Sequence, residues 1–204
     1  MRRPGVGPGR GADPTATRRR ILRAATRLYA AHGPEGVTVR AIGALANVTA
    51  PTIYWHFESM GALVRHVIDA AFEPLLAKLQ TIDSDATPRA RLLTATRIYR
   101  EFALANPREY HTMFMVPDRG RGVLRGSRIS VGKQTFDILR GIVADCIEAG
   151  DIRGETPESG ALVIWGFVHG LVALQTAGRI GMDRGAFELF FDRAYAVLLR
   201  GLRG

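Results

Sequence analysis

The chain has 204 residues, 47% of them hydrophobic, and a single cysteine, so it can bury a sizeable core but cannot form an internal disulfide. Its 28 basic and 19 acidic residues leave a formal net charge of +9, and residues 1–60 alone hold nine Arg against three acidic residues. Biased genome composition explains part of the Arg count but not this clustering, which favours nucleic acid over an anionic membrane surface as the partner.

The first fourteen residues are predicted to be a flexible basic tail, because a segment this rich in Gly, Arg and Pro cannot offset its ordering entropy by burial. A helix is predicted over residues 17–32, where apolar side chains recur on one helical face. Gly33-Pro34 ends this helix. The residues that share its inward face are Ile21, Ala25, Leu28, Tyr29 and His32.

A short helix follows, and Thr38 is its predicted N-cap, because a Thr hydroxyl there can bond an otherwise unpaired backbone N–H. Asn47 tolerates the left-handed conformation, so residues 46–49 can reverse the chain direction in about four residues. The apolar positions of the helix are Val39, Ile42, Leu45 and Ala46.

The second short helix has Thr49 as its predicted N-cap and accepts Pro51 in its first turn. Ile53 and Phe57, four residues apart, are predicted to face inward. The alternative is that residues 54–57 are packed core aromatics, but only Phe57 fits that stripe. The side chains left for solvent or a ligand are Ala50, Pro51, Thr52, Tyr54, Trp55 and His56.

Ser59 can cap a longer helix over residues 60–80, and five further helical patterns follow. They cover residues 88–105, 107–116, 127–149, 157–177 and 184–202. No convincing alternating strand pattern interrupts them, so the predicted class is all-α with about nine helices. The predicted domains are the tail (1–14), a helix-turn-helix domain (15–60) and a larger helical bundle (61–204), within which residues 117–128 are expected to be least ordered.

Two short helices joined by a tight turn, with polar and aromatic groups exposed on the second, meet the requirements for reading a DNA major groove. Residues 38–57, and above all the run Pro-Thr-Ile-Tyr-Trp-His-Phe at 51–57, resemble the DNA-binding domain of the TetR family of repressors. The chain differs from the usual pattern of that family at Met60, where Lys is usual, and at Asn47, where Gly is usual. The first difference removes one phosphate contact, which the arginines of the tail can replace.

The resemblance implies a role for each matching residue on an operator in double-stranded DNA. Phosphate contacts are implied for Thr38, for the second helix N-terminus at Thr49 and Ala50, and for Tyr54 and His56. Approach to base edges is implied for Arg40, Pro51, Thr52 and Trp55. These residue types suit those roles, because Arg can grip a guanine edge and Thr or Pro can contact a thymine methyl.

Residues 106–114 and 165–170 resemble two motifs of one subgroup of TetR C-terminal domains, the second reading Trp-x-x-x-His-Gly. The resemblance implies a homodimer and a small-molecule effector pocket, and two DNA half-sites also require two recognition helices. Candidate pocket residues are Phe102, Tyr110, Met113, Phe114, Phe136, Trp165 and His169. Candidate interface residues are Leu162, Leu171, Leu174, Phe187, Phe190, Phe191, Tyr195 and Leu198. Packing within one chain is the alternative for each residue of both sets.

An enzyme needs a nucleophile with its base, or a metal cluster, and the sequence holds neither H-E-x-x-H, G-x-S-x-G nor paired Cys. Cys146 with a distant His or Asp is the remaining option, so we expect no catalysis, no metal and no cofactor. No apolar run approaches the roughly 18 residues of a membrane span, and residues 1–15 lack the apolar stretch of a secretory signal. We therefore expect a cytoplasmic protein that does not contact the membrane.

The expected function is a ligand-responsive transcriptional regulator that represses from a palindromic operator as a dimer and is released by a small molecule. An activator of the same fold and a non-specific DNA-binding protein are the alternatives. A regulator should prefer one palindrome by roughly a thousandfold or more, whereas a non-specific protein binds any duplex equally. The effector and the promoter do not follow from the sequence.

Overall fold

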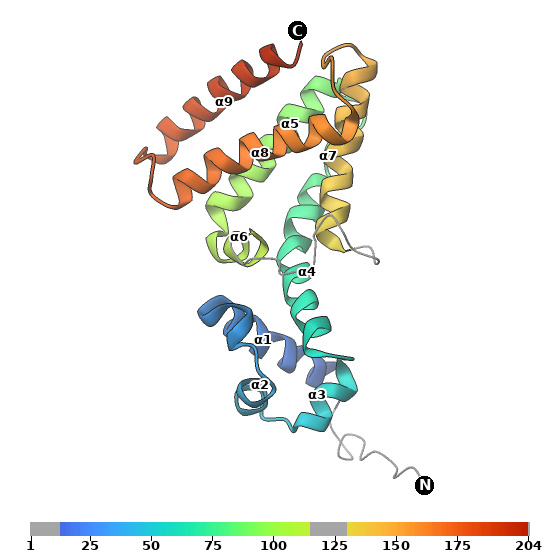
Figure 1. Ribbon diagram of the computed structural model, residues 1–204, viewed down its shortest axis with the longest axis vertical. Helices are drawn as coiled ribbons and strands as arrows, with labels where there is room; N and C mark the ends of the chain where they lie inside the picture. Colours follow the sequence, from blue (N-terminus) through green and yellow to red (C-terminus); the bar gives the residue numbers. More distant parts are fainter. Residues whose placement is uncertain (1–12, 115–129, 204) are drawn as a thin grey trace. The chain divides into compact units, whose positions relative to one another are not determined.

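The computed structural model describes residues 13–114 and 130–203, which form nine helices and no strand (Figure 1). The helices are α1 (Pro14–Gly36), α2 (Val39–Ala46), α3 (Ala50–His56), α4 (Met60–Leu79), α5 (Pro88–Ala105), α6 (Pro107–Phe114), α7 (Val131–Glu148), α8 (Pro157–Thr176) and α9 (Arg184–Gly201). The all-α prediction is confirmed for this part of the chain. The predictions for residues 1–12 and for residues 117–128 lie outside the described residues.

The described residues divide into two compact units. The N-terminal unit comprises residues 13–71 and 108–114, and the C-terminal unit comprises residues 72–107 and 130–203. The chain passes from the first to the second within α4, so the N-terminal unit holds α1, α2, α3, the first turns of α4 and, from Arg108 on, α6.

The N-terminal unit has an apolar core to which each of its first four helices contributes. Ile21 and Tyr29 of α1, Ile42 of α2, Ile53 of α3 and Leu63 of α4 are all at most 1% exposed. Burying each such side chain contributes roughly 1.5–3 kcal/mol, which is how helices as short as α2 and α3 are held in place.

Nearby residues determine where α1 begins and where it breaks. The Asp13 carboxylate accepts a hydrogen bond from the Thr15 backbone N–H at 2.9 Å, so the helix begins at Pro14, three residues before the predicted start. Gly33 breaks it as predicted, with a φ of 67° that favours glycine, and one further turn follows up to Gly36. His32 was expected on the inward face, but it is exposed because it lies in the last turn before this kink.

In the C-terminal unit, α5, α7 and α8 pack against one another and α9 packs on α8. Phe102 of α5, Ile164 of α8 and Phe191 of α9 are among its buried side chains. The contact between α7 and α8 is close at Gly160, where an added Cβ would lie 3.0 Å from Cγ1 of Val143.

A buried cation joins α5 to α9. Arg100 is 4% exposed, its Nη1 donates to the Asp192 carboxylate at 3.1 Å, and its guanidinium lies 4.9 Å from the centre of the Phe191 ring. Arg97 donates to the same carboxylate at 2.6 Å. Burial alone would raise the pKa of Asp192, but the hydrogen bonds and charges of the two arginines outweigh it and lower this pKa.

The expectation that no apolar run approaches the length of a membrane span is wrong for α8. By length and composition alone, this 20-residue helix is long and apolar enough to cross a membrane. Core helices of soluble proteins pass the same test, and Ile164, Val168 and Val172 on one side of α8 are buried in the C-terminal unit.

Candidate nucleic-acid interface

The turn between α2 and α3 is built from three local features. Thr38 caps α2 as predicted, its hydroxyl accepting from the Ala41 N–H at 3.2 Å. Asn47 adopts the predicted left-handed conformation with φ 50° and ψ 59°, and the Val48 N–H donates to the Gly43 carbonyl at 3.1 Å. An added Cβ at Gly43 would lie 3.0 Å from the Val48 carbonyl oxygen, so a side chain there would require a small shift of this backbone.

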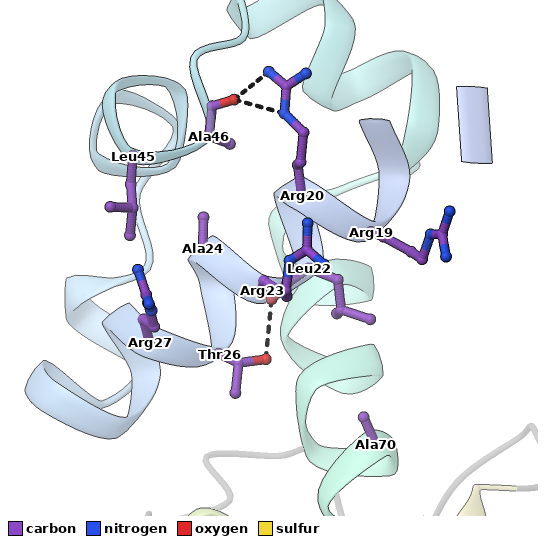
Figure 2. A pocket seen from close by; sticks show the side chains of 10 residues that line it. All are labelled: Arg19, Arg20, Leu22, Arg23, Ala24, Thr26, Arg27, Leu45, Ala46 and Ala70. Atoms are coloured by element: carbon purple, nitrogen blue, oxygen red, sulfur yellow. Dashed lines mark hydrogen bonds between the residues drawn. The ribbon is translucent and has the colours of Figure 1, made fainter. Parts of the chain in front are cut away.

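An arginine of α1 holds the same turn (Figure 2). The Arg20 guanidinium donates to the Ala46 carbonyl from Nε at 3.2 Å and from Nη2 at 2.5 Å, and to the Asn47 carbonyl at 2.9 Å. The carbonyls at the end of a helix have no intrahelical donor, and a cation there also suits the helix dipole. The sequence did not predict this clamp, because no local pattern links residues 26 positions apart.

α3 presents two large aromatic side chains to solvent. Tyr54 is 52% and Trp55 is 57% exposed, whereas Ile53 and Phe57 are 1% and 3% exposed and belong to the core. The predicted division of this segment into two inward anchors and an outward aromatic face is therefore confirmed. Large aromatic side chains are seldom left this exposed, and both are accessible to a partner.

Thr49 occupies the position before α3, but its hydroxyl makes no hydrogen bond to the helix backbone. It lies 2.9 Å from the Thr52 hydroxyl instead. Thr49 is thus the N-cap of α3 by position, as predicted, but its side chain does not cap the helix backbone. The pair orients Thr52 at the edge of the outward face of α3.

His56 is half-buried beside that face. Its ring meets the Trp55 ring edge-on, with ring centres 4.6 Å apart, and its Nε2 has no hydrogen-bond partner among the described residues. Burial, and then the positive charge of Arg18, lower the pKa of His56 from its ordinary value of 6.5. The ring is therefore neutral at pH 7 and has one N–H to donate.

Arg18 also braces the end of α3 from α1. Its guanidinium lies 4.9 Å from the centre of the Phe57 ring, and its Nη2 lies 3.3 Å from Nε2 of His66 on α4. Burial, followed by Arg18, lowers the pKa of His66, which keeps its ring neutral and able to accept this contact.

All nine residues predicted to contact DNA lie in or beside α2 and α3 of the N-terminal unit. The exposed ones are Thr38, Arg40, Thr49, Ala50, Pro51, Tyr54 and Trp55. Thr52 and His56 are half-buried. A capped pair of short helices with a rigid turn and an outward aromatic face is the geometry of a helix-turn-helix.

Two family profiles match the chain. The profile described as "Bacterial regulatory proteins, tetR family" matches residues 21–67, and "Tetracyclin repressor-like, C-terminal domain" matches residues 92–198. The chain belongs to the TetR family. It is a DNA-binding, ligand-responsive transcriptional regulator, as the sequence predicted.

Individual members of the family resemble this TetR-family regulator over different lengths. It is 28% identical to the HTH-type transcriptional regulator TtgR of Pseudomonas putida over 172 residues, which cover 76% of this chain and 78% of TtgR. It is 30% identical to the tetracycline repressor protein class A from transposon 1721 of Escherichia coli over 108 residues, which cover 53% of this chain and 44% of that protein.

Solved structures share its fold. A protein of unknown function from Rhodococcus sp. RHA1 has a TM-score of 0.71 at 23% identity, covering 98% of this chain and 100% of the other. AibR, solved in complex with isovaleryl coenzyme A and operator DNA, has a TM-score of 0.58 at 21% identity, covering 77% of this chain and 86% of AibR.

In the C-terminal unit of the TetR-family chain, three of the predicted effector residues lie together. The Phe136 and Trp165 ring centres are 6.1 Å apart, and those of Trp165 and His169 are 5.9 Å apart. The Tyr99 hydroxyl, which the sequence did not single out, lies 2.7 Å from Nδ1 of His169. Burial lowers the pKa of His169, so this ring is neutral.

The other four predicted effector residues are distributed over both units. Phe102 is buried in the C-terminal unit, on the same helix as Tyr99. Tyr110, Met113 and Phe114 lie on α6, which groups with the N-terminal unit.

The predicted dimer-interface residues fall into two groups, one at least partly exposed and one buried. Leu162, Leu174 and Phe190 are 39%, 48% and 37% exposed, and Leu171 and Leu198 are half-buried. Phe187, Phe191 and Tyr195 are at most 2% exposed, because they fill the interior of their own chain, and they are not available to a partner. Exposed apolar residues that the prediction omitted are Val163 on α8 and Leu189 and Val197 on α9.

Cys146, the one nucleophile that the sequence offered for catalysis, is fully buried on α7. Burial, with Asp151 and Asp145 nearby, raises the pKa of its thiol to about 11. It is therefore protonated at neutral pH.

Among residues 13–114 and 130–203, His, Cys, Asp and Glu side chains form no group of three that could hold a metal ion.

Proposed function

We propose that this TetR-family regulator is a repressor that binds a palindromic operator as a homodimer, with α3 in the major groove, and that a small molecule bound in the C-terminal unit releases it. The observation that carries the proposal is the exposure of Tyr54 and Trp55 on a helix whose position is fixed by the Asn47 turn and by Arg20. A major groove about 12 Å wide admits such a helix.

The proposed roles follow from chemistry and position. Thr52 and Trp55, with Arg40 and Pro51, contact base edges, where an oriented hydroxyl and a large exposed ring discriminate between base pairs. Contacts to phosphate come from the helix starts at Thr38, Thr49 and Ala50 and from Tyr54 and His56. The Tyr54 hydroxyl and the neutral His56 ring donate to phosphate and set the register of α3.

Observations in the C-terminal unit support the proposed dimer and the proposed effector site. The exposed apolar side chains of α8 and α9, such as Leu174 and Phe190, are typical of a helical interface. The aromatic cluster around the Tyr99–His169 hydrogen bond offers apolar surface with one polar contact, which suits a small organic effector. AibR, which shares the fold, was solved with a small molecule and operator DNA together.

We further propose that residues 15–60 act as the DNA-binding domain, that residues 61–204 take the effector and the second subunit, and that the regulator works in the cytoplasm. DNA is found there, and a lone apolar helix such as α8 is weak evidence for a membrane.

Selection of bound sites from random duplexes tests the operator proposal. We expect an enriched inverted repeat whose half-sites lie about one helical turn apart. Thr52→Ala and Trp55→Ala should change the selected bases, while Arg179→Ala, an exposed change in the C-terminal unit, should not. Enrichment of no sequence would instead identify a non-specific DNA-binding protein.

The direction of regulation needs a separate measurement. With the selected operator placed over a reporter promoter, expression of the regulator should lower transcription. Increased transcription would identify an activator and contradict the repressor proposal.

A further inference from the structure

An open groove with a volume of about 620 Å³ lies along α1 in the N-terminal unit (Figure 2). Four arginines of α1 line it together with apolar side chains, among them Leu45 of α2 and Ala70 of α4. None of the described residues that line it is acidic. The groove is therefore a strongly basic surface with apolar patches, on the unit that also carries α3.

Three of the four arginines have no ion-pair partner among the residues that the structure describes. Arg20 is engaged with the carbonyls at the end of α2, but Arg19, Arg23 and Arg27 are exposed and form no ion pair in the described ranges. They are four residues apart, so they succeed one another about every 6 Å along one side of α1. A fixed row of like charges at this spacing attracts a partner with matching negative charges.

The apolar side chains of the groove favour an amphipathic protein segment over a phosphate backbone as the partner. Leu45 is 48% exposed at the end of α2, and Leu22 of α1 is half-buried. A phosphate backbone uses the arginines but gains nothing from these leucines. An amphipathic helix uses both, because its acidic residues recur every turn beside apolar ones.

The groove is also distinct from the surface that reads DNA. No residue of α3 lines it. Ala70, on one of its walls, lies ten residues after Met60, the first residue of α4, which is about 15 Å along that helix. The proposed base-reading residues Trp55 and Thr52 are therefore not part of the groove.

We propose that this groove binds an acidic amphipathic helix of another protein. Carboxylates spaced four residues apart pair with Arg19, Arg23 and Arg27, and apolar residues beside them rest on Leu45 and Leu22. The guanidinium fork suits paired contacts with carboxylates. The proposal goes beyond operator binding, because it gives the DNA-bound regulator a surface for a protein partner.

A designed peptide is the probe. It is a fluorescein-labelled, end-capped helix of about 18 residues with Glu at every fourth position and Leu beside it, titrated with the full-length protein and followed by anisotropy. The wild type should bind it, and Arg23→Glu with Arg27→Glu should weaken binding at least about tenfold. Arg108→Glu with Arg179→Glu changes the charge equally at exposed positions outside the groove and should weaken it far less.

A second peptide of the same composition, with Glu and Leu in an order that breaks the helical spacing, tests the geometry. It should bind at least about tenfold more weakly, and Leu45→Ser should remove most of this difference. Equal binding of the two peptides, or no binding of the first, overturns the proposal.

Affinity for the selected inverted-repeat duplex is measured on the same samples. The Arg23→Glu/Arg27→Glu variant should retain most of its operator affinity. If it loses operator affinity while still binding the peptide, the arginines contact DNA and the proposal is overturned. A wild type that binds the duplex but not the peptide contradicts the groove proposal alone and leaves the proposed function standing.

Discussion

Arg20 and Ala46 are joined by two hydrogen bonds, at 3.2 and 2.5 Å, that close the end of α2 from α1. The partly buried pair supports the turn on which the position of α3 depends. It therefore links the stability of the N-terminal unit to the binding of DNA.

Arg20→Met keeps the apolar stem of the side chain but removes its donors. We expect the free energy of unfolding to fall by about 1–3 kcal/mol and operator affinity to fall with it, because the carbonyls of Ala46 and Asn47 lose a charged donor. Urea unfolding and duplex binding measure the two effects. Arg19→Met, at an exposed position, should change stability by less than about 0.5 kcal/mol, and an equal loss in both variants would contradict the role of the clamp.

Substitutions at two adjacent residues of α3 should have different effects, one on the stability of the fold and the other on operator binding. Ile53→Ala removes a core side chain and should cost about 2–4 kcal/mol of unfolding free energy. Tyr54→Ala, at a position 52% exposed, should leave the urea midpoint nearly unchanged yet weaken operator binding. A large loss of stability for Tyr54→Ala would show that its ring packs in the core.

The Asp192 ion pairs predict a dependence of stability on pH. The folded pKa of Asp192 is lowered, so its contribution is complete above the unfolded value, about 3.9, and is lost as the pH falls through the folded pKa. Asp192→Asn, which leaves buried Arg100 with only the more distant Glu101 carboxylate at 3.6 Å, should cost about 2 kcal/mol at neutral pH. The difference in unfolding free energy between the two proteins should begin to shrink below about pH 4 and vanish below the folded pKa of Asp192. A difference that does not depend on pH would contradict this account.

The exposed apolar side chains of α8 and α9 predict that Leu174→Glu with Phe190→Glu converts a dimer into a monomer. A charge in a buried interface is costly, whereas the folded monomer tolerates it at positions 48% and 37% exposed. Sedimentation velocity measures the assembly state. Leu45→Glu, at a position equally exposed but in the N-terminal unit, is the matched control and should remain dimeric.

Cys146 should be unreactive in the folded protein. With a pKa of about 11, only about one thiol in a thousand is ionised at pH 8, and the side chain is also fully buried. Iodoacetamide should therefore modify it slowly in buffer and rapidly in urea. Fast modification of the native protein would show that the thiol is accessible.

The features that the sequence predicted correctly have local causes. The Thr38 cap, the break at Gly33 and the left-handed Asn47 each depend on groups within about one helical turn. The inward position of Ile53 and Phe57 follows from their four-residue spacing, which any helix places on one face. The same periodicity along the chain was enough to predict the all-α class.

The remainder depends on contacts that no local pattern contains. Arg20 of α1 donates a hydrogen bond to the Ala46 carbonyl on α2. The Thr49 hydroxyl forms a hydrogen bond with the Thr52 hydroxyl and not with the helix backbone. Phe187 and Phe191 were assigned to a dimer interface because an apolar pattern shows that a side chain is covered, but not whether its own chain or a second copy covers it.

Gly43 limits the ways in which operator preference can change. A Cβ there would lie 3.0 Å from the Val48 carbonyl oxygen, so a substitution requires a small shift of the backbone in the turn before α3. Thr52 and Trp55 lie outside the fully buried core, and exchanging them leaves the packing below α3 intact. We therefore expect new operator specificities to arise from changes on the outward face of one seven-residue helix, while the turn that presents it stays the same.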